Sequence, residues 1–351
     1  MNINFLGDIA IFNTFQVLKI DPFAEIELPD SDFNIGNFES IVESGSESKF
    51  FDVRRNRSCT IEYLKSLNLK VFDAFGFANN HCLDYGIDGY LRCANVLEEN
   101  GICTFGFSQS ESYSLGVIKN KDIKIAIIGC VKSGRWNKSN FGYGPDEYEP
   151  NKIIDEITRV KNNYNHVVVY PHWGTEFIEV PNKEDIINAS LFIDAGASAV
   201  IGHHPHISQG IEFYKNGIIA YSLGSFIYLP GEDIGYTMCA KNAKYSICLS
   251  VDFGEEKIQN VSSYLYSYDD QRKIPVRVHH DEANKYLLYL NTNIENSNVR
   301  KRQIVNVLFK REIKAFFKRV RMNPFRAFLH YVKYTYSFLI KRMTSTKNSN
   351  K

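Results

Sequence analysis

The sequence has few features of disulfide-rich secreted proteins or of membrane-spanning proteins. Its seven cysteines are an odd number and include no Cys-x-x-Cys pair, which argues against a disulfide framework and a thiolate zinc site. No uncharged apolar run approaches the roughly 20 residues of a membrane-spanning helix. No basic and apolar signal-peptide pattern precedes the first strand-like segment. We therefore expect a cytoplasmic chain without a signal peptide or transmembrane helix.

Charge is nearly balanced overall but unevenly distributed. Residues 299–351 contain 15 lysines and arginines against one acid, Glu312, a net charge of +14, whereas residues 1–298 carry 26 basic and 39 acidic residues, a net charge of −13. With 44% hydrophobic residues, the chain is neither disordered nor collagen-like. These numbers indicate an acidic globular body followed by a basic segment suited to anionic surfaces.

Short apolar runs rich in β-branched residues alternate with helix-compatible segments over the first 226 residues. This alternation predicts an α/β domain with buried strands, in a layered αββα or doubly wound arrangement. The expected strands are 3–6, 33–35, 71–77, 123–128, 166–170, 199–201 and 217–221, and the expected helices are 61–67, 89–100, 151–162 and 183–195. We divide the chain into a domain at 1–256, a domain-closing segment with strand-like pieces and connector at 257–298, and a basic amphipathic helical tail at 299–351.

Polar residues follow five of the expected strands. They are Asp8, then Asn37 and Glu39, then Asn80 and His81, then His172, and finally His203, His204 and His206. In open α/β sheets the ligand crevice lies outside the carboxyl ends of the strands, so groups far apart in sequence can meet there. This mixture of carboxylate, amide and imidazole suits divalent metal ions.

A site for two cations needs acidic ligands, because ions roughly 3.5 to 4 Å apart repel each other. Asp8 and Glu39 are the natural acidic candidates. His172, His204 and His206 can complete the coordination without adding charge. We therefore predict two divalent metal ions, with Mn, Fe or Zn as candidates.

Each of these residues alone has an ordinary structural explanation. A single His after a strand is more often a hydrogen-bonded structural group, and an Asp there is more often a turn former or helix cap; we interpret Asp84 in that way. Five of the nine histidines, however, lie at strand ends beside Gly or Pro, and this clustering favours a site. An extended backbone at His204 to His206 would direct both rings to one face and His203 elsewhere.

Six motifs resemble, in order and approximate spacing, those of the CapA family. They are Gly7-Asp8, Gly36 to Glu39, Ala78 to Gly86, His172 to Phe177, Gly202 to His206, and Tyr221 to Phe226, where Ser225 replaces the family's usual Asn. The resemblance covers Met1 to roughly Phe253. It implies a calcineurin-like metallophosphoesterase fold and a part in bacterial capsule or poly-γ-glutamate synthesis.

The resemblance also implies roles for individual residues. Asp8, Glu39, Asn80, His172, His204 and His206 correspond to metal ligands, and Asn37 and His203 to groups that orient those ligands. His81 would be the general acid that protonates the leaving oxygen in phosphoester hydrolysis.

Three further residues are candidates for substrate contacts at the crevice. They are Trp173 and Glu176, which follow the expected strand at 166–170, and Arg135, in a long loop after the expected strand at 123–128. Long loops of that kind often bind substrate. Burial in the core is the alternative for Trp173.

The basic tail has an amphipathic pattern. Apolar residues fall at 305, 308, 309, 313, 316, 317 and 320 with lysines and arginines between them, and Asn323-Pro324 marks a break before a second apolar stripe. Two aromatic-rich helices with cationic flanks favour an anionic membrane surface as partner. Docking on the acidic body remains open as an alternative, and we do not expect nucleic acid.

Two functions follow from these observations. The first is a divalent-metal-dependent hydrolase of phosphoester type, acting on a cell-surface polymer or its phosphorylated precursor. The second is a non-catalytic metal-containing binding module in a membrane-associated capsule assembly complex, with a membrane synthase as partner. Fold and motif establish a site and not its substrate, so the sequence leaves both open.

Overall fold

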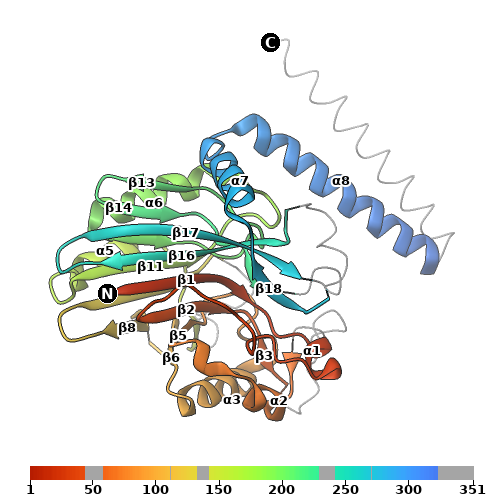
Figure 1. Ribbon diagram of the computed structural model, residues 1–351, viewed down its shortest axis with the longest axis horizontal. Helices are drawn as coiled ribbons and strands as arrows, with labels where there is room; N and C mark the ends of the chain where they lie inside the picture. The colour runs from red at the N-terminus through yellow and green to blue at the C-terminus, as the bar shows by residue number, and fades with distance from the viewer. Residues whose placement is uncertain (44–57, 111, 133–141, 229–241, 270, 323–351) are drawn as a thin grey trace. The chain divides into compact units, whose positions relative to one another are not determined.

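The computed structural model describes residues 1–43, 58–110, 112–132, 142–228, 242–269 and 271–322, with side chains described up to residue 309. The chain divides into two compact units, residues 1–301 and 302–351. The first unit contains two large β-sheets and several helices that pack around them (Figure 1).

The first sheet is mixed. Strands β1, β2, β5 and β6 run parallel to one another, and β16, β17 and β18 extend the sheet in antiparallel fashion from β1. Its order is β18 (Ile274–Arg277), β17 (Ile258–Asp269), β16 (Tyr245–Phe253), β1 (Asn2–Ile9), β2 (Phe33–Phe38), β5 (Ala74–Gly76) and β6 (Cys103–Phe105), while β15 (Ser225–Ile227) also pairs with β1.

The second sheet has a parallel centre and antiparallel edges. Its order is β13 (Ile211–Tyr214), β14 (Gly217–Ala220), β12 (Ala199–Ile201), β11 (His166–His172), β9 (Lys124–Val131) and β8 (Leu115–Lys119). Two small pairs, β3 (Ile41–Val42) with β4 (Ser58–Cys59) and β7 (Phe107–Ser108) with β10 (Gly144–Pro145), complete the described strands.

Alternating side chains of the buried strands fill two different layers. On β9, Ile125 and Ile127 belong to the core that also contains Phe5 of β1, so they pack between the sheets. Ala126 and Ile128 belong to the outer core, which also contains residues of α5 and α6. A strand covered on both faces needs apolar residues at every position, which explains the unbroken apolar run in the sequence.

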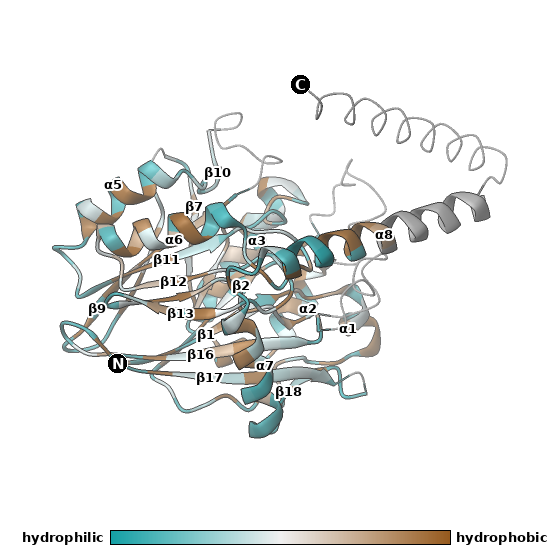
Figure 2. Cartoon of the chain, turned by 90° about the horizontal axis from the view of Figure 1, so that it is seen from above, coloured by the Kyte–Doolittle hydropathy of each residue, from teal (hydrophilic) through white to brown (hydrophobic). Residues whose placement is uncertain are grey.

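Helices cover the outer face of each sheet. Residues of α1, α2 and α3 share a core with Phe38 and Phe75 of the first sheet, and α5 and α6 cover the second sheet, as Figure 2 shows from above. The helices are α1 (Asn13–Leu18), α2 (Ile61–Ser66), α3 (Gly86–Glu99), α5 (Pro150–Val160), α6 (Lys183–Ala195), α7 (His280–Thr292) and α8 (Ser297–Met322), with a 3-10 turn η2 at Leu69–Val71. The predicted layered αββα arrangement is confirmed.

Most of the predicted elements coincide with the observed ones to within a few residues. The strand expected at 71–77 is shorter, because Val71 ends the 3-10 turn and only Ala74–Gly76 pairs with β2. The helix expected in the tail lies within α8, which begins earlier, at Ser297. The second apolar stripe, after Asn323, lies outside the described residues. Among the described residues, no helix is long and apolar enough to cross a membrane.

A local irregularity in β1 directs Asp8. The pairing of β1 with β2 shifts register between Phe5 and Asp8, and such an irregularity can redirect a side chain. Gly7, next to Asp8, allows β1 to approach the segment before β15 closely, because a Cβ there would lie 2.1 Å from the carbonyl oxygen of Gly224. The Gly-Asp motif therefore combines a close backbone approach with the carboxylate that follows it.

Candidate metal and catalytic centre

The first sheet contributes two acids and an amide. Asp8 lies near the end of β1, Asn37 near the end of β2, and Glu39 directly after β2. All three are buried, and both carboxylates are fully inaccessible. Asn37 Nδ2 donates a hydrogen bond of 2.8 Å to Asp8 Oδ1. Parallel pairing of β1 and β2 therefore brings these side chains to one edge of the sheet.

The second sheet contributes the imidazoles. His172 is the last residue of β11, and the segment that carries the other three histidines follows β12. Asn37 Nδ2 lies 3.3 Å from His172 Nδ1, so the amide of the first sheet contacts an imidazole of the second. The carboxyl ends of the two sheets thus meet, as the sequence predicts.

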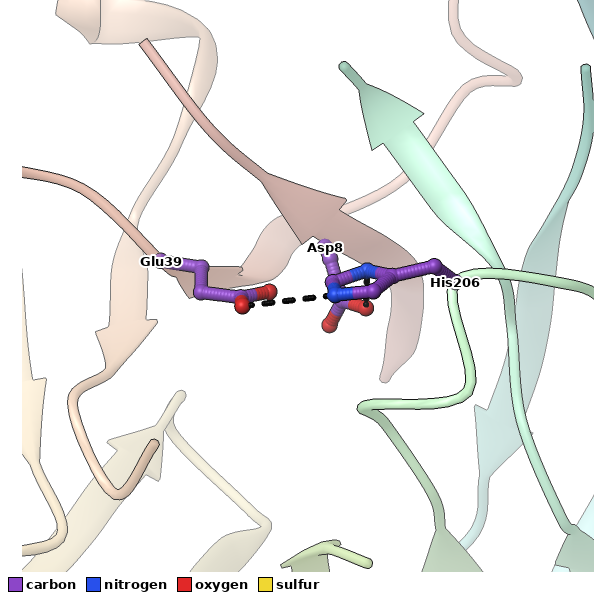
Figure 3. A group of neighbouring side chains, drawn as sticks. All are labelled: Asp8, Glu39 and His206. Atoms are coloured by element: carbon purple, nitrogen blue, oxygen red, sulfur yellow. Dashed lines mark ion pairs between the residues drawn. The ribbon is translucent and has the colours of Figure 1, made fainter. Parts of the chain in front are cut away.

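An acidic half of the site is formed by Asp8, Glu39 and His206. One ligand atom from each lies within 4.8 Å of the others. His206 Nδ1 is 3.1 Å from Asp8 Oδ2, and His206 Nε2 is 3.5 Å from Glu39 Oε1. Figure 3 shows the ion pairs of this imidazole with both carboxylates. Two carboxylates and an imidazole are a donor set suited to a divalent cation.

A neutral half of the site is formed by Asn80, His172 and His204. Asn80 Oδ1 is 2.9 Å from His172 Nε2, which is 3.1 Å from His204 Nδ1. The backbone N–H of His204 also donates to Asp8 Oδ2, at 3.3 Å. Asp8 therefore stands between the two halves, where a bridging carboxylate would be needed.

The electrostatics of the site favour a charged carboxylate at Asp8 and neutral imidazoles at His172 and His204. Burial raises the pKa of Asp8, but hydrogen bonds and charge from His203 and His206 outweigh it and hold that pKa well below its usual range. Burial and the neighbouring His204 lower the pKa of His172, and burial with the charge of His206 lowers the pKa of His204 to about 4. Ionised carboxylates and neutral imidazoles are the forms that bind metal ions, so these residues fit divalent cations.

His81 is held by a carboxylate that the sequence analysis missed. Its Nδ1 lies 2.6 Å from Asp84 Oδ2, and its Nε2 lies 3.5 Å from Glu39 Oε1. Asp84 is buried and lies in a turn, as the sequence predicts, but its contact with His81 was not predicted. The three-residue spacing within a turn, with Asp84 N bonded to His81 O, is the signal that could have revealed the pair.

The predicted extended conformation of the His204-Pro205-His206 segment is wrong. Both histidines have positive φ, 95° for His204 and 55° for His206, so alternation of side chains does not apply. Such conformations are costly for non-glycine residues and concentrate at functional sites. His203 also faces the site, since its Nδ1 lies 3.3 Å from Asp8 Oδ1. Among the described residues, its buried Nε2 has no hydrogen-bond partner.

The three candidate substrate contacts have different outcomes. Trp173 is 1% exposed and donates through Nε1 to Tyr221 O in the outer core, so the substrate contact considered for it is wrong and the core alternative holds. Glu176 is half-buried, and its negative charge opposes the lowering of the His204 pKa. Arg135 lies outside the described residues.

Two further polar residues, Ser225 and Asn79, contact residues of the site. Ser225 Oγ lies 3.1 Å from His206 Nδ1, so the hydroxyl contacts a candidate ligand. Asn79 is buried, accepts from the backbone N–H of His81 and donates to Phe38 O. It thereby ties the segment of Asn80 and His81 to the end of β2, next to Glu39.

Fold and site together define a four-layered α/β protein with a buried acid–histidine centre at the carboxyl ends of its two sheets. Residues 2–229 match the model of a family described as bacterial capsule synthesis protein PGA_cap. The chain belongs to this family, and the predicted relation to CapA proteins is confirmed.

Two curated relatives are named CapA proteins. The chain is 30% identical over 249 residues to the PGA biosynthesis protein CapA of Bacillus subtilis, covering 66% of this chain and 64% of that protein. It is 28% identical over 214 residues to the capsule biosynthesis protein CapA of Bacillus anthracis, covering 58% and 52%. The matched part thus spans less than two thirds of either relative.

Solved structures show a more distant similarity. A hypothetical protein from Thermus thermophilus has a TM-score of 0.49 at 14% identity, covering 76% of this chain and 99% of that one. A 5'-nucleotidase from Candida albicans has a TM-score of 0.39 at 10% identity, covering 89% and 57%.

Proposed function

We propose that the protein is a divalent-metal-dependent hydrolase of phosphoester type that acts in the synthesis or processing of a capsule or another cell-surface polymer. One observation carries the proposal: Asp8, Glu39 and His206 gather beside Asn80, His172 and His204, with the His81–Asp84 pair at the same edge. When bound, two cations would act as Lewis acids toward a phosphoryl group.

The residues of the chain divide the remaining work. Asp8 and Glu39 supply the negative charge that holds cations. The neutral imidazoles complete the ligand set without adding further negative charge. Asp84 accepts from His81 Nδ1 and so directs Nε2 towards the centre. From there His81 can protonate the leaving oxygen, a contribution of about 10²- to 10⁴-fold.

The His81–Asp84 pair favours a hydrolase over a binding module. A site that only held metal or polymer would need ligands, but it would not need an imidazole oriented by a buried carboxylate. The substrate class that we propose is a polymer phosphodiester or a phosphorylated precursor, and the proposed partner is a membrane synthase.

Removal of metal should abolish activity. We expect the full chain, purified without chelators, to contain divalent metal by elemental analysis and to hydrolyse bis-p-nitrophenyl phosphate. Dialysis against EDTA should remove both properties, and Mn²⁺, Fe²⁺ or Zn²⁺ should restore turnover. Protein that contains metal but shows no turnover with any of these ions would indicate the binding module, and metal-free protein would contradict both functions.

We also propose that the basic tail binds an anionic membrane surface. Residues 302–351 carry 13 basic residues against Glu312, and each Lys or Arg near such a surface contributes about 1 kcal/mol. The full chain should float with phosphatidylglycerol-containing vesicles but not with phosphatidylcholine vesicles, and less at high salt. Deletion of residues 302–351, which retains the whole first unit, should abolish flotation. Equal flotation of both proteins would exclude the tail as the anchor.

A further inference from the structure

The loop of residues 174–182, between β11 and α6, contacts the histidine segment of the site. The N–H of Phe177 donates to Pro205 O at 2.7 Å, and the Phe177 ring lies 6.0 Å from the His206 ring between centroids. Phe177 has a φ of 61°, in the left-handed region that a Phe rarely adopts. Its conformation therefore depends on contacts that hold the loop from outside.

Residues of α7 and α8 hold the opposite side of this loop. The carboxylate of Glu179, which is only 8% exposed, accepts hydrogen bonds from Tyr286 Oη at 3.0 Å and Tyr289 Oη at 3.2 Å. The two tyrosines are three residues apart on α7, so they lie on one helix face. Arg300 donates to Val180 O at 2.8 Å and also to Asn182 Oδ1.

The hydrogen bonds from α7 therefore help to fix the position of the loop. A buried carboxylate is costly unless it is hydrogen-bonded, and the two tyrosines supply two of the donors to Glu179; Asn242 Nδ2 supplies another, at 2.7 Å. Burial, and next the charge of Glu179, raise the pKa of Tyr286 well above its usual value. Its hydroxyl therefore stays protonated and remains a donor at neutral pH.

We propose that Tyr286, Tyr289 and Arg300 are positioning residues for the acid–histidine centre. Acting through the loop 174–182, they hold Phe177 against His206. The inference rests on the proposed metal-dependent function. All three residues lie beyond the segment 2–229 that matches the family model. The wall of the site is therefore completed by a part of the chain that the family description does not cover.

The test compares the loss of the tyrosine hydroxyls that bind Glu179 in the loop with the loss of a tyrosine hydroxyl that binds a glutamate of α7. The double substitution Tyr286→Phe with Tyr289→Phe removes both hydroxyls from Glu179 but retains the rings. The control is Tyr245→Phe, because Tyr245 Oη donates to Glu282 on α7 rather than to Glu179, and the substitution keeps the ring that packs on Tyr286. Both proteins are made as full chains, and Mn²⁺ affinity is measured by calorimetry beside the thermal midpoint.

We expect the double substitution to weaken Mn²⁺ binding roughly tenfold or more, as for other groups that orient metal ligands. The control should leave the Mn²⁺ affinity of the unaltered chain unchanged, because no hydrogen bond to Glu179 is lost. If the double variant does not fold, variants of Arg300 provide the test. Arg300→Ala should weaken Mn²⁺ binding, and Arg300→Lys, which keeps a donor, should lose less of the affinity than Arg300→Ala.

The possible results separate the inference from the proposed function. Unchanged Mn²⁺ affinity in the folded double variant, or in Arg300→Ala, would overturn the positioning role while leaving the metal-dependent function intact. Equal weakening by Tyr245→Phe would also overturn it, because general destabilisation would then explain the loss. Absence of Mn²⁺ binding by the unaltered chain would overturn the proposed function itself.

Discussion

Replacing Asp8 by Asn is expected to cause the largest loss of metal binding and activity of any single substitution at the site. Asp8 is fully buried, its Oδ1 accepts from Asn37, and its Oδ2 faces both His206 Nδ1 and the N–H of His204. It is therefore the residue shared by the acidic and neutral halves. Asn has nearly the same volume, so the change removes the charge with little change in packing.

The amide introduced by Asp8→Asn would also place N–H groups where donors already point. Groups that only orient metal ligands cost about 10- to 100-fold when removed, so loss of a shared ligand should cost at least about 100-fold in metal affinity. Elemental analysis after dialysis should find at least one cation missing. Hydrolysis of bis-p-nitrophenyl phosphate should fall at least in proportion.

Asp73→Asn is the matched control for this change. Asp73 directly precedes β5, its Oδ2 accepts from the backbone N–H of Asn34 at 2.7 Å, and it is not part of the acid–histidine cluster. The control should retain its metal. Asp8→Asn protein with full metal content and full activity would contradict the proposed role of Asp8.

Replacing His81 by Ala is expected to have the second-largest effect, on turnover alone. His81 lies beside Glu39 but is held by Asp84, so its loss should leave the metal content unchanged. Loss of a general acid should lower kcat by about 10²- to 10⁴-fold. Asp84→Asn should have a smaller effect of about 10- to 100-fold, because the imidazole remains but its orientation and tautomer are no longer held.

The leaving group distinguishes general acid catalysis from a structural effect. A p-nitrophenolate leaves with little need for a proton, whereas an unsubstituted phenolate needs one. His81→Ala should therefore lower kcat much more for a phenyl phosphodiester than for the p-nitrophenyl analogue. An equal loss with both substrates would contradict the general acid role. His280→Ala, at an exposed histidine on α7, should change neither rate.

Much of the fold could be predicted from local sequence. The unbroken apolar run at Ile125–Ile128 indicates a strand covered on both faces, and the structure places its alternate residues in two different cores. Strand ends could be predicted less well: Val71 belongs to a 3-10 turn rather than to β5, because pairing with a short neighbour and not β-propensity sets the strand length.

The site was predicted where a residue's position at a strand end determined its place. Asp8 and Asn37 meet because parallel pairing brings the carboxyl ends of β1 and β2 to one edge, and His172 lies at the carboxyl end of β11 in the second sheet. Sequence reasoning failed where local backbone geometry decided. The positive φ values of His204 and His206 break the expected alternation, and the turn after Asn80 brings Asp84 to His81.

The amino-acid sequence alone determined the class of fold, the family and the set of chemically suitable residues, because hydrophobic periodicity and short motifs are local properties. Only the tertiary structure decided that Trp173 is part of the core, that Asp84 supports His81, and that α7 holds the loop beside the site. These relations depend on side-chain directions and on contacts between segments as far apart as Glu179 and Tyr286. Such contacts leave no periodic signal in the chain, since packing of whole layers determines them.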